Sequence, residues 1–304
     1  MQILISTFSQ GLIWTILALG VFITFRILNF ADMTSEGSLT LGGSICAILI
    51  TNGVNPFISL LISGMAASVA GLVTGILHTK LKIQPILSGI LTMIALYSIN
   101  IRIMGKANLS LLGKSTVFSR LENGVPFLKE NFTLSTFIIG LITCIISILI
   151  LNLFFKTQLG LAIRATGDNE QMMRAQGGNT DFKKILALMI SNLLCGIAGA
   201  LIAQSQGYSD VNMGTGAIVI ALASIVIGEA FIKLIESKNK ILKSLICVAL
   251  GSICYRMIIF FVLNLGMNPS DLKLFTAFIT AVLLGVPHIK KITTKGVNRN
   301  AAIK

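Results

Sequence analysis

Apolar stretches close to the ~20 residues that cross a bilayer recur along almost the whole chain of 304 residues. The stretches are separated by short polar segments, and no polar block is long enough for a separate domain. The sequence therefore predicts an all-α fold, a polytopic bundle of about eight to ten transmembrane helices. We expect one membrane domain over residues 1–290, a basic tail over 291–304, and helices near 4–25, 37–51, 56–78, 84–104, 133–155, 185–207, 216–235, 243–265 and 272–288.

The composition excludes a soluble globular domain, because only 12% of the residues are charged and soluble domains carry roughly a quarter. The net charge of +13 does not indicate a nucleic-acid partner, since the basic residues lie in short loops and form no patch. The first residues, MQILISTFSQ, lack the basic segment of a signal peptide. We therefore expect the first stretch to remain as a span, with lipid as the surroundings.

The distribution of basic residues predicts the orientation. With nine spans, five of the 24 Lys and Arg residues fall in outer loops, Arg102 and Arg256 lie within or at the ends of spans, and the others fall on the opposite side. Cytoplasmic loops carry the excess of Lys and Arg. This predicts a multi-pass protein of the bacterial cytoplasmic membrane, with residues 156–184 and the C-terminus in the cytoplasm.

A weak internal sequence similarity suggests an inverted repeat. Residues 30–34, FADMT, follow the first span and resemble residues 208–212, YSDVN, which follow the sixth. The predicted topology puts the two segments on opposite faces, as inverted repeats of transporters require. Five residues can also match by chance.

The sequence shows no constellation typical of catalysis. The five cysteines lie inside apolar stretches without a CxxC pair, and His78 and His288 lie apart at span ends, so we expect no metal. The run GKST at 113–116 resembles the end of a phosphate-binding loop, but Asn108 stands where that motif needs glycine. We predict no catalytic residues, no enzyme activity and no cofactor bound by this chain.

The longest polar segment on the predicted cytoplasmic face, residues 156–184, is expected to hold a short capped helix. Asp168 is the predicted N-cap, with Gln171 three residues on, and Gly177 supplies the stop. A helix of about two turns is unstable alone. Met172 and Arg174 would suit a groove of a soluble subunit, although a helix lying on the bilayer surface fits the physics equally well.

Family resemblance favours the first alternative. Residues 160–207, beginning GLAIRATGDNEQMMRAQGG, resemble the cytoplasmic coupling loop and following span of ABC importer permeases of the branched-chain amino acid family. The segments LNFADMTSEGSLTLGGSICAILI and GTGAIVIALASIVIGEAF are similar to that family's first loop with its second span, and to its late glycine-rich span. Within the family, the chain looks most similar to the branch described as tryptophan or tyrosine transport permeases.

The resemblance implies a permease subunit that moves a small solute inward by alternating access. It implies a separate cytoplasmic ABC ATPase that uses the ATP, an extracytoplasmic solute-binding protein, and a second permease copy, with a homodimer expected. An aromatic or branched-chain amino acid is the expected solute, although residues 33–36 depart from the family's usual glycines. The ATPase contact is carried over to Arg164, Ala165, Thr166, Gly167, Asp168, Asn169, Met172, Met173, Arg174 and Gly177.

Polar residues in or beside spans are candidates for a solute path, because ionisable groups are costly in lipid. Arg256 is expected to pair with Glu229 or to attract a solute carboxylate, and Glu229 also has Lys233 one turn later. An ion-coupled secondary transporter, with Glu229 carrying the ion, is the alternative function, and a membrane scaffold is a third. The candidate path residues are Asp32, Glu36, Gln204, Tyr208, Glu229 and Arg256.

Overall fold

Long helices run side by side through the computed structural model, which describes residues 2–124, 132–232, 239–265, 271, 274–278 and 280–282. The chain passes through α1 (Gln2–Phe22) with a π-helical turn (Ile23–Ile27), α2 (Thr34–Thr51), α3 (Pro56–Thr79), α4 (Pro85–Met104), β1 (Asn108–Ser110), α5 (Val117–Gly124), α6 (Phe132–Lys156), α7 (Gln158–Asp168), α8 (Glu170–Ala175), α9 (Thr180–Gln206), β2 (Tyr208–Asp210), α10 (Ala217–Phe231) and α11 (Lys240–Asn264).

Six of the helices in the described ranges are long and apolar enough to cross a membrane. They are the spans that begin at Ile3, Pro56, Pro85, Phe132, Thr180 and Lys240. The chain is therefore a multi-pass membrane helix bundle, as predicted. Of the other expected spans, 37–51 corresponds to the 18-residue α2 and 216–235 to the 15-residue α10. The prediction for 272–288 falls mostly outside the described residues, and the tail 291–304 falls entirely outside them.

Helices α1 and α9 form the centre of the bundle and run antiparallel. The Ser191 hydroxyl of α9 donates to the Gly20 carbonyl of α1 at 2.8 Å, and the apolar side chains of both helices fill the main core. Helices α4 and α6 are the least buried of the long helices. Their exposed Leu and Ile side chains provide the surface that lipid covers.

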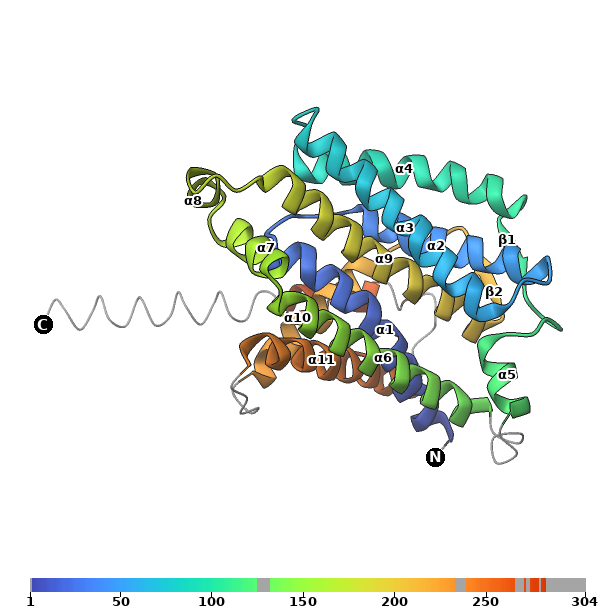
Figure 1. The fold of residues 1–304 in the computed structure, drawn as a ribbon. Helices are drawn as coiled ribbons and strands as arrows, with labels where there is room; N and C mark the ends of the chain where they lie inside the picture. Colours follow the sequence, from blue (N-terminus) through green and yellow to red (C-terminus); the bar gives the residue numbers. More distant parts are fainter. Residues whose placement is uncertain are drawn as a thin grey trace, which may run out of the picture.

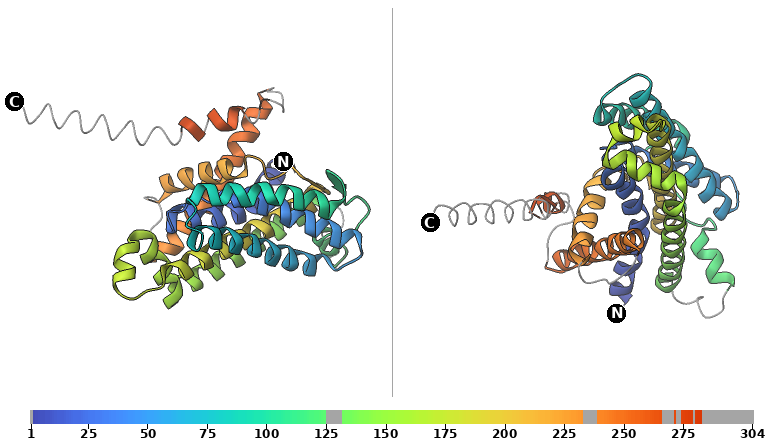
Figure 2. Two further views of the ribbon diagram at one scale, coloured as in Figure 1. Left: turned by 90° about the horizontal axis from the view of Figure 1, so that it is seen from above. Right: turned by 60° about the vertical axis from the view of Figure 1, so that its left-hand side comes forward.

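The two ends of the bundle are built differently (Figure 1). Helices α7 and α8 gather at one end, and the two-stranded ribbon of β1 and β2 lies at the other, near the N-terminus. The ribbon is antiparallel, with Leu109 opposite Ser209. We call these the α8 end and the ribbon end. The view from above in Figure 2 shows the same separation.

Two shorter helices start inside the bundle. After the π-helical turn the chain turns back from the α8 end, and α2 begins beside Asn192 near the middle of α9. After β2 the chain turns back from the ribbon end, and α10 follows Gly216, whose N–H donates to Glu36 of α2 at 3.0 Å. The first turns of α2 and α10 therefore meet inside the bundle after entering from opposite ends.

The segments before these two helices share a local structure. Asp32 accepts a hydrogen bond from the Thr34 N–H at 2.9 Å, and Asp210 accepts one from the Asn212 N–H at 2.7 Å. The repeated turn and the opposed entries support the inverted repeat that the sequence similarity suggested. However, Asp32 is fully buried and bonds to Asn192 near the middle of α9, so the expectation of a loop at the face was wrong for this residue.

Close approach of α2 to α9 depends on glycine. A Cβ built on Gly42 would overlap the Gly196 carbonyl oxygen, and a Cβ on Gly199 would overlap the Leu39 carbonyl oxygen. Small residues let membrane helices approach to backbone contact, where packing replaces the hydrophobic effect as the source of stability.

Candidate functional site

The 156–184 segment folds into two helices with a bend at Asn169. The Asn169 side chain accepts from the Met172 N–H at 3.0 Å and caps α8, whereas Asp168 is the last residue of α7. The predicted cap at Asp168 was therefore wrong by one residue. The predicted stop is confirmed, because Gly177 follows α8 with a left-handed φ of 78°.

The C-terminal end of α7 is held against the turn after α1. A Cβ on Gly167 would overlap the Ile27 carbonyl oxygen, and the Asn29 side chain donates to the Gly167 carbonyl at 2.9 Å. Thr166 is buried beside this contact, and Ala165 is half-buried. A displacement of α7 would thus be passed directly to the end of the central helix α1.

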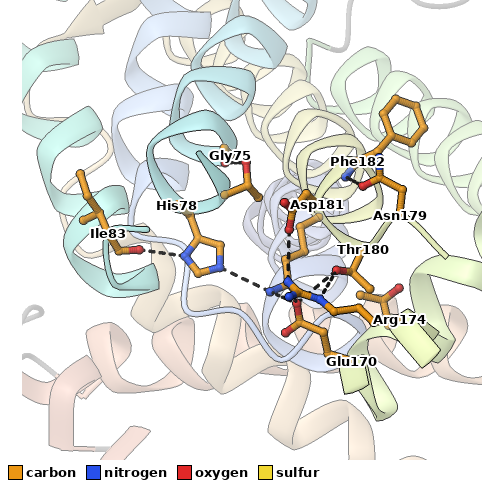
Figure 3. A network of polar contacts seen from close by, with 12 residues as sticks. Gly75, His78, Ile83, Glu170, Arg174, Asn179, Thr180, Asp181 and Phe182 are labelled. Carbon is orange, nitrogen blue, oxygen red and sulfur yellow. Dashed lines mark hydrogen bonds and ion pairs between the residues drawn. The ribbon is translucent and has the colours of Figure 1, made fainter. Parts of the chain in front are cut away.

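Helix α8 is held to the start of α9 by a polar network (Figure 3). Glu170 accepts from Arg174 at 2.7 Å and from Lys184 at 2.7 Å, and Arg174 also bonds to Thr180 at 2.8 Å and to Asp181 at 3.3 Å. The partial burial of Glu170 opposes ionisation. The hydrogen bond from Lys184 and the charges of Lys184 and Arg174 outweigh that burial and lower the pKa of the Glu170 carboxyl.

The same network reaches α3 through His78. The Lys184 ammonium lies 3.5 Å from His78 Nε2, while His78 Nδ1 lies 2.8 Å from the Ile83 carbonyl oxygen before α4. The His78 ring also packs edge-on against Phe30, with the ring centroids 5.0 Å apart. Sequence reasoning treated His78 as an interfacial residue and missed this link, because its partners are distant in sequence.

The outward surface of the segment combines apolar and basic groups. The Met172 side chain is 54% exposed, whereas Met173 folds back against Gly178 and is only half-exposed. Arg164 borders a hollow between α7 and the start of α11, opposite Lys240. The predicted coupling residues therefore lie together at the α8 end but form two helices instead of one.

Glu229 lies at the α8 end of α10 and forms an ion pair with Arg26, with Arg26 Nε 2.7 Å from the carboxylate. The expected pair between Glu229 and Arg256 was wrong, because Arg256 lies toward the ribbon end of α11. The alternative partner, Lys233, is outside the described residues. The pair with Arg26 links α10 to the end of α1.

Three of the other path candidates make contacts within the packed bundle. Asp32 accepts from Asn192 at 2.8 Å, Glu36 holds the first turn of α10, and Gln204 accepts from the Val117 N–H at 2.8 Å. Glu36 also borders a cavity of about 310 Å³ between α2, α4 and residues 211–215. Asp32 and Gln204 are almost fully buried, and their contacts join separate elements of the bundle.

Arg256 and Tyr208 lie at the ribbon end, beside two adjoining cavities. One, of about 200 Å³, is bordered by Arg256 and by Ser9 of α1. The other, of about 400 Å³, is bordered by Tyr208. Trp14, Ile202 and Gln206 border both cavities. The structure thus brings together two of the six predicted path residues and adds Trp14, which sequence reasoning did not select.

Comparison with known protein families shows which family this chain belongs to. The family described as the permease component of the branched-chain amino acid transport system matches residues 3–287. The chain belongs to this permease family. The permease is thus a transport subunit, the permease component of an ABC importer for amino acids or sugars, as the sequence resemblance implied.

Relatives of the permease carry names of several transport systems. It is 44% identical to the tyrosine transport system permease protein of Clostridioides difficile, over 94% of this chain and 92% of that protein. It is 28% identical to a fructose import permease protein of Bifidobacterium longum, over 90% of this chain and 74% of that protein. A probable branched-chain amino acid transport permease protein of Methanocaldococcus jannaschii is 27% identical, over 67% of this chain and 66% of that protein. No solved structure matches the permease significantly.

Proposed function

We propose that this permease imports an amino acid, aromatic or branched-chain, by alternating access driven by a separate cytoplasmic ABC ATPase. A solute-binding protein delivers the amino acid at the ribbon end, and a second copy of the chain completes the pore. ATP is bound and used by the ATPase subunit and not by this chain. The name of the 44% identical relative, a tyrosine transport system permease, supports the amino-acid class.

The observation that carries the proposal is the attachment of the α7–α8 segment to both central helices. Gly167 and Asn29 join α7 to the end of α1, and Glu170 joins α8 to Lys184 in the first turns of α9. Coupling between distant sites requires rigid contacts of this kind and two alternative arrangements of the bundle. A push on α8 would therefore tilt α1 and α9 relative to each other, at the centre of the bundle.

The exposed part of the segment suits a groove in a soluble partner. Met172 offers an adaptable apolar side chain, and Arg164 offers a charge beside the hollow at α11. These two residues lie outside the network of Glu170 and Arg174, so they can be replaced without breaking it.

Co-purification tests the proposal. The tagged permease is isolated from its native membranes in mild detergent, and wild type is compared with the double substitution Met172→Asp, Arg164→Glu. We expect an ATPase subunit to accompany the wild type and to be lost from the double variant. The matched control is Leu112→Asp, an exposed apolar residue at the ribbon end, which should retain the ATPase.

Reconstitution then separates this function from the alternative. Liposomes containing the permease and its ATPase, with the solute-binding protein and the amino acid outside, should take up the amino acid only when ATP is present inside, on the side of the ATPase. If an ion gradient drove amino-acid transport by the purified chain alone, and no ATPase bound to the chain, the importer proposal would be wrong. The permease would then be a secondary transporter.

A further inference from the structure

Arg256 carries a charge that no acid in the described part of the chain neutralises. The ion pairs found there join other residues, and the Arg256 Nε is buried without a hydrogen-bond partner. Its guanidinium carbon lies 4.2 Å from the centroid of the Trp14 ring. A cation–π contact offsets only part of the cost of withdrawing a charged group from water.

Arg256 borders the 200 Å³ cavity between α1, the start of α6, α9 and α11. The polar groups around this cavity include the hydroxyls of Ser6, Ser9 and Ser205 and the side-chain amide of Gln206. Asp and Glu are absent from its lining. The cavity thus has one permanent positive charge, several neutral donors and acceptors, and no negative charge of its own.

A site with these properties suits the carboxylate group of a small solute. Guanidinium groups bind planar carboxylates through paired N–H donors, and neutral hydroxyl and amide oxygens can accept from an ammonium group. The Trp14 ring and Ile202 extend the lining toward the adjoining 400 Å³ cavity. A side chain attached to the carboxylate-bearing carbon would therefore enter mixed surroundings, with Trp14, Tyr208 and Met213 beside polar groups that include Asp210.

We propose that this cavity is a binding site for the α-carboxylate of the transported amino acid, with Arg256 as the group that binds it and Trp14 as the group that positions Arg256. The inference rests on the proposed import of an amino acid and adds a specific site to it. The cavity is lined by residues from the first half of α1, the start of α6 and the end of α9, and the end of the bundle opposite α7 and α8 is where α6 begins and α9 ends (Figure 1). Solute would enter there before the bundle changes its opening.

The protein contains its own reporter of binding at this site. Trp14 is the single tryptophan of the chain and lies against Arg256, so its fluorescence should change when a ligand meets the guanidinium. The full-length permease in detergent is titrated with L-leucine, L-phenylalanine and L-tyrosine, and with isoamylamine, phenethylamine and tyramine. Each amine lacks only the carboxylate of the matching amino acid, and Trp14→Phe confirms the origin of the signal.

We expect wild type to bind at least one of the amino acids about 10- to 100-fold more tightly than the matching amine, the range for a hydrogen bond to a charged group. Arg256→Gln should abolish this preference for the carboxylate, and Arg256→Lys should restore part of it. Arg102→Gln, at the exposed end of α4, is the control and should behave as wild type. A residue that only packs would not change the ratio between acid and amine.

Equal binding of acid and amine by the wild type would overturn the site, whether or not the Arg256 variants fold. So would ATP-driven uptake of an amino acid that leaves Trp14 fluorescence unchanged and is unaffected by Arg256→Gln; the importer function would then stand without this site. Carboxylate-selective binding by a chain that recruits no ATPase would support the site and contradict the proposed function.

Discussion

Replacing Glu170 by glutamine should loosen α8 from α9 while leaving the shape of the side chain unchanged. The change removes the negative charge that forms ion pairs with Arg174 and with Lys184, each at 2.7 Å. The pair with Arg174 spans one helical turn and is exposed, so it contributes about 0.3–0.5 kcal/mol. The Lys184 side chain is only 14% exposed, so that pair lies near the upper limit of about 1 kcal/mol for accessible pairs.

Together the losses amount to about 1–1.5 kcal/mol, or roughly a tenfold increase in local opening of α8. Amide hydrogen exchange of residues 169–184 in the intact protein measures this opening directly. The effect should be smaller at high salt, because salt screens exposed pairs. In the reconstituted importer, the ATPase should continue to turn over while amino-acid uptake falls.

The matched control is Asp168→Asn, which removes an acid from the same segment that takes part in none of the ion pairs among the described residues. Its exchange should match that of the wild type. If Glu170→Gln changed exchange in α8 by less than about twofold, or if Asp168→Asn changed it equally, the network would not be what holds α8, and the coupling argument would lose its basis.

Three further outcomes follow from the contacts. Acid should loosen α8 in the wild type, because the pKa of Glu170 is lowered in the folded protein. The stability that Glu170 gives to α8 is complete above the ordinary pKa of 4.5 and is lost as the pH falls through the lowered pKa. Hydrogen exchange across that range should show no such transition in Glu170→Gln. Asn169→Ala should destabilise α8 by about 1 kcal/mol, whereas Asp168→Ala should not, which hydrogen exchange also resolves. Gly42→Ala should lower the midpoint of thermal unfolding in detergent by a cost of about 1–3 kcal/mol, because its methyl group would meet the Gly196 carbonyl; an unchanged midpoint would contradict the close packing of α2 on α9.

The fold class followed from the sequence because it depends on local composition. A stretch of twenty apolar residues has few alternatives to a membrane helix, and the long helices occur where their patterns predicted them. The short helices α2 and α10 were harder to interpret, since a half-length helix and a tilted full span have similar composition. Only their contacts, such as that of Glu36 with Gly216, show that they begin inside the bundle.

Two predictions at the site were wrong, the cap of α8 and the ion pair of Glu229, because the sequence offered more than one suitable residue for each. Asp168 and Asn169 are equally suitable caps, and the contact of Gly167 with Ile27 sets the end of α7 at Asp168. Glu229 had suitable partners nearby in sequence or in the next helix. The packing of α10 on the end of α1 instead gave it Arg26, about 200 residues away.

The placement of Asp32 and Glu36 has a consequence for how the protein is made. Their hydrogen-bond partners, Asn192 and the backbone of Gly216, are synthesised 160 and 180 residues later. At about 5–20 residues per second, the ribosome needs about 8–36 s to produce them. During that interval both carboxyl groups lack these distant partners, and Asp32 has the N–H of its neighbour Thr34. We therefore expect α2 to reach its final place in the bundle only after α9 and α10 have been made.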